Sequence, residues 1–321
     1  MLKSRNNFSK NGQRLCFLVL GMHRSGTSAL SRTLSLMGAA LPKKLMVAGE
    51  GNSQGHWESQ RLADYHDLIL TKLQSSWDTP DFLDLTRLSN ANREQIKQEI
   101  IQIIHEEYGD AETIVIKDPR ICRFPEFFGE CLEAAGYNIQ PVFIFRHPFE
   151  VIESLQKRKA FWRNDYGDNE AAILWMIHNL EILKFLENFS RVNCSYASFF
   201  KDWRRIVTNI IYKTDAVYLS YDLLLNDWQQ SAKKILHKAG RSTLRINKEV
   251  RKEVEAFLTG DLRHNYFQLS KVSLDTDLLK CVEELWELLN KRKYNRKFFD
   301  SADLIRNRLN LILANRNCVN S

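Results

Sequence analysis

Four short runs of apolar residues divide the chain, and each is followed by sequence with helical periodicity. They are LCFLVLG at 15–21, TIVIKDP at 113–119, PVFIFRHP at 141–148 and AVYLSY at 216–221. Short apolar runs without polar alternation are typical of strands that are buried on both faces, as in parallel sheets. Because these strands alternate with helices, the pattern predicts an α/β protein with a parallel sheet flanked by helices.

Helical periodicity is clearest directly after the first run. Leu30, Leu34 and Met37 recur at i, i+4 and i+7, and Gly38 is a natural C-terminal stop. Further helices are predicted at about 91–108, 149–158, 168–189 and 223–239. The stretch 38–60 is instead rich in glycine, which is typical of a loop that can cover a site.

The pattern predicts three parts along the chain. We expect residues 1–14 to be a disordered leader, residues 15–270 a P-loop-type α/β domain, and residues 271–321 a helical C-terminal extension. The N-terminus superficially resembles a signal peptide, basic and then apolar, but its apolar run is short and no small-residue cleavage pattern follows. No stretch approaches the roughly 18 apolar residues needed to cross a bilayer. We therefore expect a cytoplasmic protein without a transmembrane segment.

Composition and charge say less about the fold and the ligand than the hydrophobic pattern does. With 321 residues and 44% hydrophobic side chains, the chain is long enough to bury a sizeable core. An excess of 46 Lys and Arg over 39 Asp and Glu gives a net charge of +7, which suits an anionic ligand without identifying it. The six cysteines contain no C-x-x-C pair, so neither a zinc site nor a disulfide framework is predicted, and a reducing compartment is expected.

The candidate chemistry starts at GMHRSGTS, between the first predicted strand and its helix. In this context G-x-x-x-x-G is typical of a phosphate-binding loop, whose backbone N–H groups and helix N-terminus hold an anion. The candidate anion-binding residues are Met22, His23, Arg24, Ser25, Gly26, Thr27 and Ser28. Nucleoside triphosphatases have a lysine after the second glycine, but here that position is Thr27. Arg24 is instead positioned to bring its guanidinium to the oxygen that joins a phosphate to a transferred group.

Seven ordered segments together resemble the bacterial type of sulfotransferase that uses 3'-phosphoadenosine 5'-phosphosulfate (PAPS). They are GMHRSGTS (21–28), GHWES (55–59), SSWDTP (75–80), IKDPRICRFPEFF (116–128), FRHPFEVIESLQKR (145–158), YLSYDLLLNDW (218–228) and FLTGDLRH (257–264). The resemblance extends over roughly residues 15–265. It implies that PAPS is the co-substrate and that the first segment holds its 5'-phosphosulfate.

The resemblance also implies roles for individual residues. Arg146 and Ser154 would bind the 3'-phosphate, and Tyr221 would lie near the adenine. Tyr196 is an alternative, because the pattern S-Y-x5-D-W occurs twice, 25 residues apart; we prefer Tyr221 because it ends the clearer strand. From the residues alone, Arg146 can instead pair with a glutamate of its own helix, and Ser154 can be an ordinary helix residue. The glycine-rich C-terminal loop of animal cytosolic members of the family is absent. Arg263 is therefore a candidate for an additional basic group at the 3'-phosphate site.

Sulfuryl transfer needs in-line positioning and charge stabilisation more than covalent catalysis. The transferred group carries less negative charge than a phosphoryl group, so magnesium is dispensable and no metal site is expected. Arg24 is the leading electrostatic catalyst. Lys117 ends a predicted strand and is expected at the sulfuryl or bridging oxygens, with an ion pair to Asp118 or an interaction with a helix end as the alternative.

An acceptor hydroxyl must lose its proton as the new bond forms, which requires a base within hydrogen-bond reach. Glu58 is favoured because it follows the glycine-rich loop and matches a segment of the resembling family, while His56 and Glu50 are competitors. The alternative for Glu58 is a charge that stabilises a helix N-terminus. His66 and His105 lie on helical patterns, and we expect them to be structural.

We therefore expect a sulfotransferase that moves a sulfuryl group from PAPS to a hydroxyl of a carbohydrate or another polar bacterial metabolite. Its partner would be a small-molecule or glycan acceptor and not a nucleic acid; the oligomeric state stays open. Two other classes are considered: a P-loop small-molecule kinase and a non-catalytic nucleotide-binding interaction module. Phosphate transfer from ATP without PAPS affinity would identify the kinase, and PAPS binding without turnover would identify the module.

Overall fold

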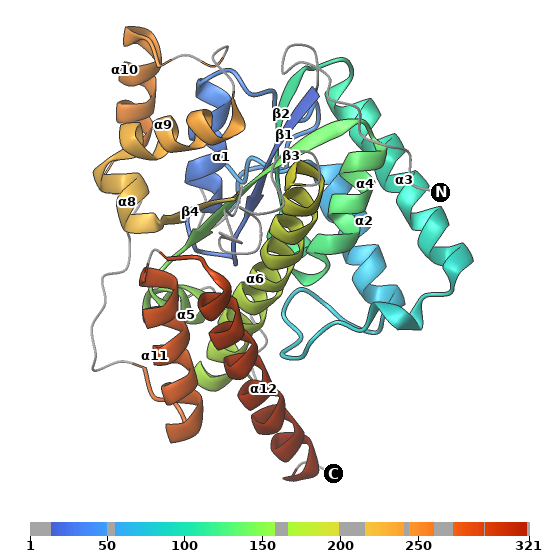
Figure 1. The fold of residues 1–321 in the computed structure, drawn as a ribbon, viewed down its shortest axis with the longest axis vertical. Coiled ribbons are helices and arrows are strands. Elements are labelled where there is room, and N and C mark those ends of the chain that lie inside the picture. The colour runs from blue at the N-terminus through green and yellow to red at the C-terminus, as the bar shows by residue number, and fades with distance from the viewer. Residues whose placement is uncertain are drawn as a thin grey trace.

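The structure, a computed structural model, describes residues 14–49, 55–157, 166–198, 216–240, 244, 246–259, 272–291 and 293–319. Within these residues, four strands form one sheet in the order β2-β1-β3-β4, and every neighbouring pair is parallel (Figure 1). The strands are β1 (Arg14–Leu20), β2 (Thr113–Lys117), β3 (Tyr137–Phe145) and β4 (Val217–Ser220). Each strand overlaps one of the four predicted apolar runs, so the predicted α/β class with a parallel sheet is confirmed. Residues 1–13 of the predicted leader lie outside the described ranges.

β3 begins before the apolar run that predicted it. Its first residues, 137–140, pair in parallel register with residues 14–17 of β1. This part of the strand contains the exposed, polar Asn138, so it lacks a continuous apolar signal. Pairing with β1, rather than the composition of the segment itself, extends the strand there.

The sheet is buried on both faces, and alternate residues of each strand supply the two faces. In β1, Cys16, Leu18 and Leu20 belong to one hydrophobic cluster, whereas Phe17 and Val19 belong to the other. Because both faces need apolar side chains, every position of the strand from Leu15 to Leu20 is apolar, as the sequence pattern indicates.

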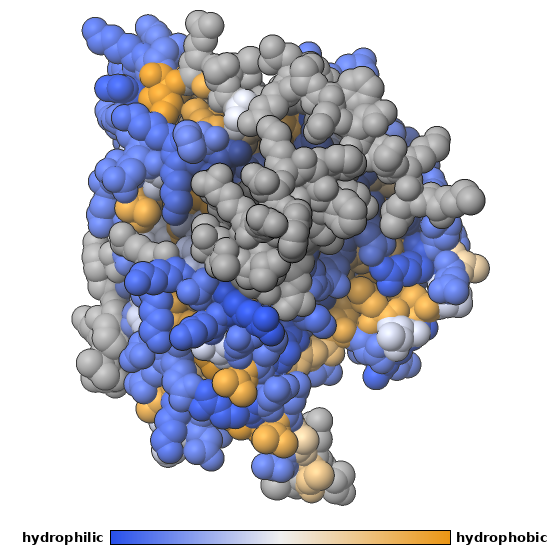
Figure 2. Space-filling model, in the orientation of Figure 1, coloured by the Kyte–Doolittle hydropathy of each residue, from blue (hydrophilic) through white to orange (hydrophobic). Residues whose placement is uncertain are grey.

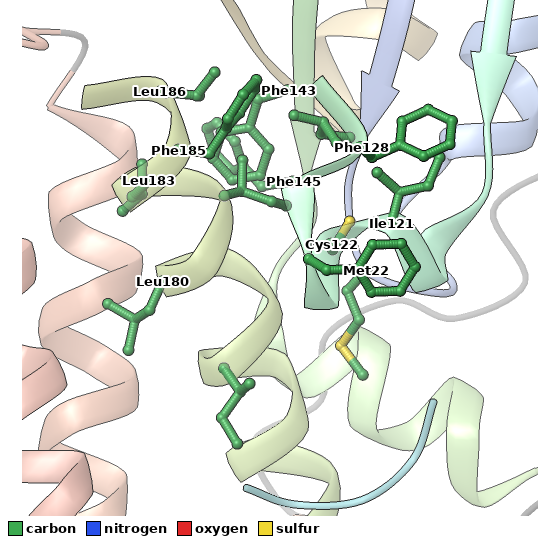
Figure 3. Packing of buried hydrophobic residues seen from close by; sticks show 14 of the residues in the cluster. Met22, Ile121, Cys122, Phe128, Phe143, Phe145, Leu180, Leu183, Phe185 and Leu186 are labelled. Carbon is green, nitrogen blue, oxygen red and sulfur yellow. The ribbon is translucent and has the colours of Figure 1, made fainter. Parts of the chain in front are cut away.

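Helices form a layer on each face of the sheet (Figure 1). The layer on the Phe17 face contains α1 (Thr27–Leu36), α8 (Tyr221–Asn226), α9 (Trp228–Ala239) and α10 (Lys248–Phe257). The other layer contains α2 (Gln60–Lys72), α3 (Asn90–Tyr108), α4 (Pro125–Ala134), α5 (Pro148–Gln156), α6 (Asp168–Ser198), α11 (Thr276–Asn290) and α12 (Arg296–Val319), with the 3-10 helices η1 (Leu85–Arg87) and η2 (Pro119–Arg123). Figure 3 shows part of this second layer, where Phe143 and Phe145 of β3 share a cluster with Phe185 of α6.

Two helices differ from the sequence prediction. α6 extends beyond its predicted end at residue 189. The predicted helix 223–239 is in fact two helices, α8 and α9, because Asp227 leaves the helical conformation between them. The Asp227 side chain accepts a hydrogen bond from the Gln230 N–H and so caps α9, as Ser220 caps α8.

The strand order creates a switch point between β1 and β3. From β1 the chain crosses to β2 on one side, and from β2 it returns across β1 to β3 and continues outward to β4. The connections that leave β1 and β3 therefore diverge at the carboxyl ends of these neighbouring strands. In open α/β sheets, the crevice at such a point is the usual place for a ligand.

The C-terminal helices α11 and α12 pack against α6 (Figure 1). Leu285 and Phe299 from these helices belong to the same hydrophobic cluster as β3. Arg306 of α12 pairs with Glu181 at 2.7 Å and donates to the carbonyl oxygen of Leu180 at 2.8 Å, both on α6. The predicted helical extension therefore shares a core with the sheet.

The surface is mixed in polarity. Figure 2 shows hydrophobic atoms in separate patches among hydrophilic ones on the visible face. Two exposed leucines, Leu304 and Leu311, lie on α12, whose C-terminal end projects from the molecule (Figure 1). None of the helices in the described ranges is long and apolar enough to span a lipid bilayer.

Candidate functional site

The predicted site residues come from the carboxyl ends of all four strands. The loop 21–28 follows β1, Lys117 ends β2, Arg146 follows β3 and Tyr221 follows β4. Parallel strands present their carboxyl ends at one edge of a sheet, so these segments meet there although they are far apart in sequence. Glu58, from the loop before α2, joins them through a contact with Lys117.

The loop between β1 and α1 is a tight turn that requires its two glycines. Gly26 has φ 89°, and a Cβ there would lie 2.2 Å from the Tyr221 ring. A Cβ on Gly21 would lie 2.5 Å from the carbonyl oxygen of Ile144. α1 begins at Thr27 without a side-chain cap. Phosphate-binding loops use this arrangement to hold an anion on backbone N–H groups.

Arg24 lies at the centre of this loop and has φ 68°, an uncommon backbone conformation for a residue with a side chain. Its Nε donates to the Oγ of Ser154 on α5 at 2.8 Å. The Nη1 of Arg146 donates to the carbonyl oxygen of Arg24 at 3.2 Å. Three predicted site residues therefore converge, with Arg24 as the link between the other two.

Arg146 also pairs with a glutamate of the helix that follows it, as the sequence allows. The Nε of Arg146 donates to Oε2 of Glu150 at 2.7 Å, and both side chains are buried. The guanidinium lies over the Tyr221 ring, 5.0 Å from its centroid. Arg146 is thus held by a carboxylate, a backbone carbonyl and an aromatic face. The side chain of Tyr196 and the whole of Arg263 lie outside the described residues.

Glu58 and Lys117 form a buried pair. The Lys117 ammonium donates to Oε1 of Glu58, and each residue is 4% exposed. Burial raises the pKa of the Glu58 carboxyl, and the positive charge of Lys117 opposes that rise in pKa. Among the described residues, Lys117 therefore pairs with Glu58 and not with Asp118, the predicted alternative. The cap of α2 is Ser59, whose Oγ accepts from the Leu62 N–H.

Sequence reasoning missed Arg120, which lies beside this pair. Its Nη1 is 3.7 Å from Oε2 of Glu58 and 3.0 Å from Oδ1 of Asp118. The other oxygen of Asp118 lies 2.8 Å from Nδ1 of His66. His66 is fully buried, which agrees with its expected structural role. The signal was present in the sequence, because Asp118 and Arg120 directly follow Lys117 at the strand end.

The segment before α2 is tied to the phosphate loop. The Oγ of Ser28 donates to the carbonyl oxygen of His56 at 3.2 Å. Trp57 has φ 57°, and the guanidinium of Arg32 on α1 lies 4.4 Å from its ring centroid. These contacts anchor the segment that carries the favoured base. Glu50, a competing base in the sequence, lies outside the described residues.

His23 of the phosphate loop packs against two other rings. Its ring centroid lies 4.4 Å from that of Trp77 and 6.2 Å from that of His178. Burial lowers the pKa of His23 well below its ordinary value and lowers the pKa of His178 to about 3. Both imidazoles are therefore neutral at pH 7, and Arg24 supplies the positive side-chain charge of the loop.

A surface pocket and the search for metal ligands complete the description of candidate sites. A surface pocket between α8, α9 and α10 is lined by Asn226, Gln230, Lys233 and Glu255, among others, and by none of the predicted site residues. Within the ranges that the structure describes, no group of three or more His, Cys, Asp or Glu side chains is placed to hold a metal ion.

Comparison with known proteins gives matches to solved structures. No protein-family model matches the chain, and no curated protein matches it. The chain is similar to the sulfotransferase domain of the Synechococcus PCC 7002 olefin synthase, at 16% identity and a TM-score of 0.42, over 86% of this chain and 96% of that one. It is similar to the sulfotransferase domain of the curacin biosynthetic pathway, at 17% identity and a TM-score of 0.43, over 92% and 98%. It is also similar to a sulfotransferase from Mycobacterium tuberculosis H37Rv, at 15% identity and a TM-score of 0.40, over 85% and 76%.

Proposed function

We propose that the protein is a sulfotransferase that moves a sulfuryl group from PAPS to a hydroxyl of a carbohydrate or another polar metabolite. The observation that carries this proposal is the convergence of Arg24, Arg146 and Ser154 beside a phosphate loop that lacks the usual lysine. Two arginines and a hydroxyl suit a ligand with more anionic charge than a single 5'-phosphate provides. A nucleotide with a second phosphate meets that requirement.

At the donor end, backbone N–H groups of the loop and the N-terminus of α1 would hold the 5'-phosphosulfate. Arg146 and Ser154 would bind the 3'-phosphate by charge-assisted and neutral hydrogen bonds. Glu150 orients the Arg146 guanidinium through its Nε. Arg24, between the two phosphate positions, would stabilise the charge that develops on the leaving oxygen.

At the acceptor end, the hydroxyl proton passes to Glu58 while the oxygen–sulfur bond forms. The bond between sulfur and the 5'-phosphate oxygen breaks at the same time, which gives a sulfate ester, adenosine 3',5'-bisphosphate and protonated Glu58. Lys117 lies beside Glu58 and supplies positive charge for the sulfuryl oxygens. Because burial raises the pKa of Glu58, its carboxylate is a stronger base than an exposed one.

Incubation of the purified protein with radiolabelled PAPS and a panel of glycan and small hydroxyl acceptors tests this function. We expect a labelled sulfate ester, an equal amount of adenosine 3',5'-bisphosphate, and nearly unchanged transfer in excess chelator. Phosphate transfer from ATP and magnesium, without PAPS affinity, would instead identify a small-molecule kinase. PAPS binding without turnover would identify a nucleotide-binding module.

Glu58→Gln removes the base and keeps the shape of the side chain. We expect kcat to fall about 100-fold to 10,000-fold, because general base catalysis contributes that much. Affinity for adenosine 3',5'-bisphosphate, measured by calorimetry, should stay close to wild type. Glu130→Gln, at an exposed glutamate that pairs with Arg93, is the matched control and should keep its rate. Full activity of Glu58→Gln would move the role to another base, such as His56.

A further inference from the structure

Five charged side chains form one network around the proposed base. Two are positive and three are carboxylates: Lys117 and Arg120, and Glu58, Asp118 and Asp67. All except Asp67 are largely buried, with 14% of the Arg120 side chain exposed. Because negative charges outnumber positive ones at close range, the carboxylates compete for two cations, and an ionised Glu58 depends on how the cations are shared.

Arg120 is the cation that contacts all three carboxylates. Its Nη1 lies 3.0 Å from Oδ1 of Asp118, and its Nε lies 2.6 Å from Oδ1 of Asp67. The same Nη1 lies 3.7 Å from Oε2 of Glu58, a distance at which it contributes charge without a hydrogen bond. The backbone N–H of Arg120 also donates to Asp118 at 3.0 Å, which fixes the arginine at the strand end.

The two oxygens of Glu58 are therefore not equivalent. Lys117 donates to Oε1, whereas Oε2 faces the Arg120 guanidinium beyond hydrogen-bond distance. In these contacts Oε2 has a positive charge nearby and keeps a lone pair for a proton. Oε2 is the atom suited to receive the proton of an acceptor hydroxyl.

We propose that Arg120 is a positioning residue for the sulfuryl transfer proposed above, on which this inference rests. Its charge beside Oε2 keeps the Glu58 carboxyl ionised and oriented for the acceptor. Its bonds to Asp118 and Asp67 neutralise two carboxylates that would otherwise add negative charge next to Glu58. His66, which lies 2.8 Å from the second oxygen of Asp118, completes the pairing of that aspartate.

The charged and titratable groups around Glu58 decide in which direction its pKa moves when the Arg120 charge is removed. Around Glu58 these groups are Lys117 at the end of β2, Asp118 and Arg120 at the start of η2, His66 and Asp67 of α2, and His23 of the phosphate loop. Burial raises the pKa of Glu58, Lys117 and Arg120 lower it, and Asp118 raises it. His23 is neutral at pH 7 and adds no charge. Removal of the Arg120 charge therefore raises the pKa of Glu58 further.

Arg120→Gln removes the charge and keeps an amide N–H for Asp118. We expect the acid limb of kcat/KM for the acceptor to move to higher pH by about one unit, the usual effect of one nearby opposite charge on a carboxyl. The rate should recover toward wild type above the shifted limb, and affinity for adenosine 3',5'-bisphosphate should not change. Arg93→Gln, at a surface arginine that pairs with Glu130, is the matched control and should leave the pH profile in place.

A second readout does not need catalysis. Carboxyl carbon NMR, with the Glu58 signal assigned by its loss in Glu58→Gln, should show this carboxyl titrating at higher pH in Arg120→Gln than in wild type. Arg120→Lys keeps the charge but lacks the guanidinium, whose separate N–H groups bind Asp118 and Asp67. We expect its acid limb to stay near wild type and its kcat to fall.

An unchanged Glu58 titration in Arg120→Gln, or a loss of rate that is equal at every pH, would overturn the positioning role. If Arg120→Gln does not fold, a wild-type kcat in Arg120→Lys would overturn it as well. A wild-type protein without sulfuryl transfer, but with the shifted titration in Arg120→Gln, would reject the proposed function and retain the link between Arg120 and Glu58.

Discussion

At the scale of single residues, the candidate site contains buried charges that lie against an opposite charge. Glu58 pairs with Lys117, and Arg146 pairs with Glu150. Removal of one partner from a buried pair leaves an uncompensated charge, which costs about 3–5 kcal/mol. Substitutions here therefore change stability as well as function, and a ratio of two affinities is more informative than either affinity alone.

Arg146→Ala should lower the affinity for adenosine 3',5'-bisphosphate about tenfold to a hundredfold, because a charged hydrogen-bonding group contributes about 1.5–3 kcal/mol. Affinity for adenosine 5'-monophosphate should stay nearly the same, since that nucleotide lacks the 3'-phosphate. Calorimetry with both nucleotides gives the ratio, which partial unfolding caused by an unpaired Glu150 does not alter. Ser154→Ala should show a smaller loss in the same direction. A wild type that does not distinguish the two nucleotides would reject the 3'-phosphate assignment.

His178 links stability to pH. Burial lowers its pKa to about 3 from the ordinary value of 6.5, so between these values the unfolded chain binds a proton that the folded chain does not. Stability is therefore lost as pH falls through this window, by about 2 kcal/mol between pH 7 and pH 5. His178→Gln should remove this part of the loss, measured by urea unfolding at both pH values. Equal acid losses in wild type and His178→Gln would contradict the prediction.

At the scale of elements, the loop between β1 and α1 depends on what packs against it. Gly26 lies against the ring of Tyr221, the first residue of α8. Helix α8 follows β4, an edge strand that β3 separates from β1. Arg146, which follows β3, lies over the same ring and donates to the carbonyl oxygen of Arg24. Residues that follow two other strands, β3 and β4, therefore constrain the shape of this loop.

Gly26→Ala should destabilise the protein more than Gly109→Ala does. Both glycines have positive φ, 89° and 54°, so alanine at either position carries a conformational cost of about 1 kcal/mol or more. A Cβ at position 26 would also lie 2.2 Å from the Tyr221 ring, whereas one at position 109 meets nothing within 4 Å. We expect a lower melting temperature and weaker nucleotide binding for Gly26→Ala. Equal melting temperatures of the two variants would show that contact with Tyr221 does not constrain the loop.

At the scale of the whole molecule, the C-terminal helices complete the core beneath the site. Tyr294, between α11 and α12, stacks on Tyr218 of β4 with ring centroids 3.5 Å apart and planes 10° apart. Phe299 of α12 is 1% exposed and belongs to the same cluster as β3. The residues after the predicted boundary at 271 therefore stabilise the sheet whose edge carries the site.

Phe299→Ala should destabilise the entire fold by about 3–5 kcal/mol, the cost of removing a large buried side chain. Urea unfolding followed by circular dichroism and by tryptophan fluorescence should give coincident curves, both shifted to lower urea concentration. Leu311→Ala, at a leucine that is 66% exposed on the same helix, is the control and should have almost no effect. An early, separate transition that leaves the main one in place would instead indicate that α11 and α12 fold independently.

The sequence by itself determined the features that depend on neighbouring residues. The apolar run of β1 predicts a strand buried on both faces, because consecutive side chains point to opposite sides. The two glycines around Arg24 predict a tight turn before a helix, because a residue without Cβ tolerates the backbone that this turn needs. The break at Asp227 was also local, but an apolar helical pattern on both sides concealed its capping role.

The tertiary structure alone decided which distant residues meet. Arg24 and Ser154 are 130 positions apart, and Glu58 and Lys117 are 59 apart, so no periodicity in the chain relates them. Their contacts follow from the strand order, which brings the connections after β1, β2 and β3 to one edge of the sheet. The contact of Arg120 with Glu58 arises in the same way. Strand and turn signals can be read from neighbouring residues, whereas the partner of a buried charge depends on which segments the completed sheet brings within a few ångströms.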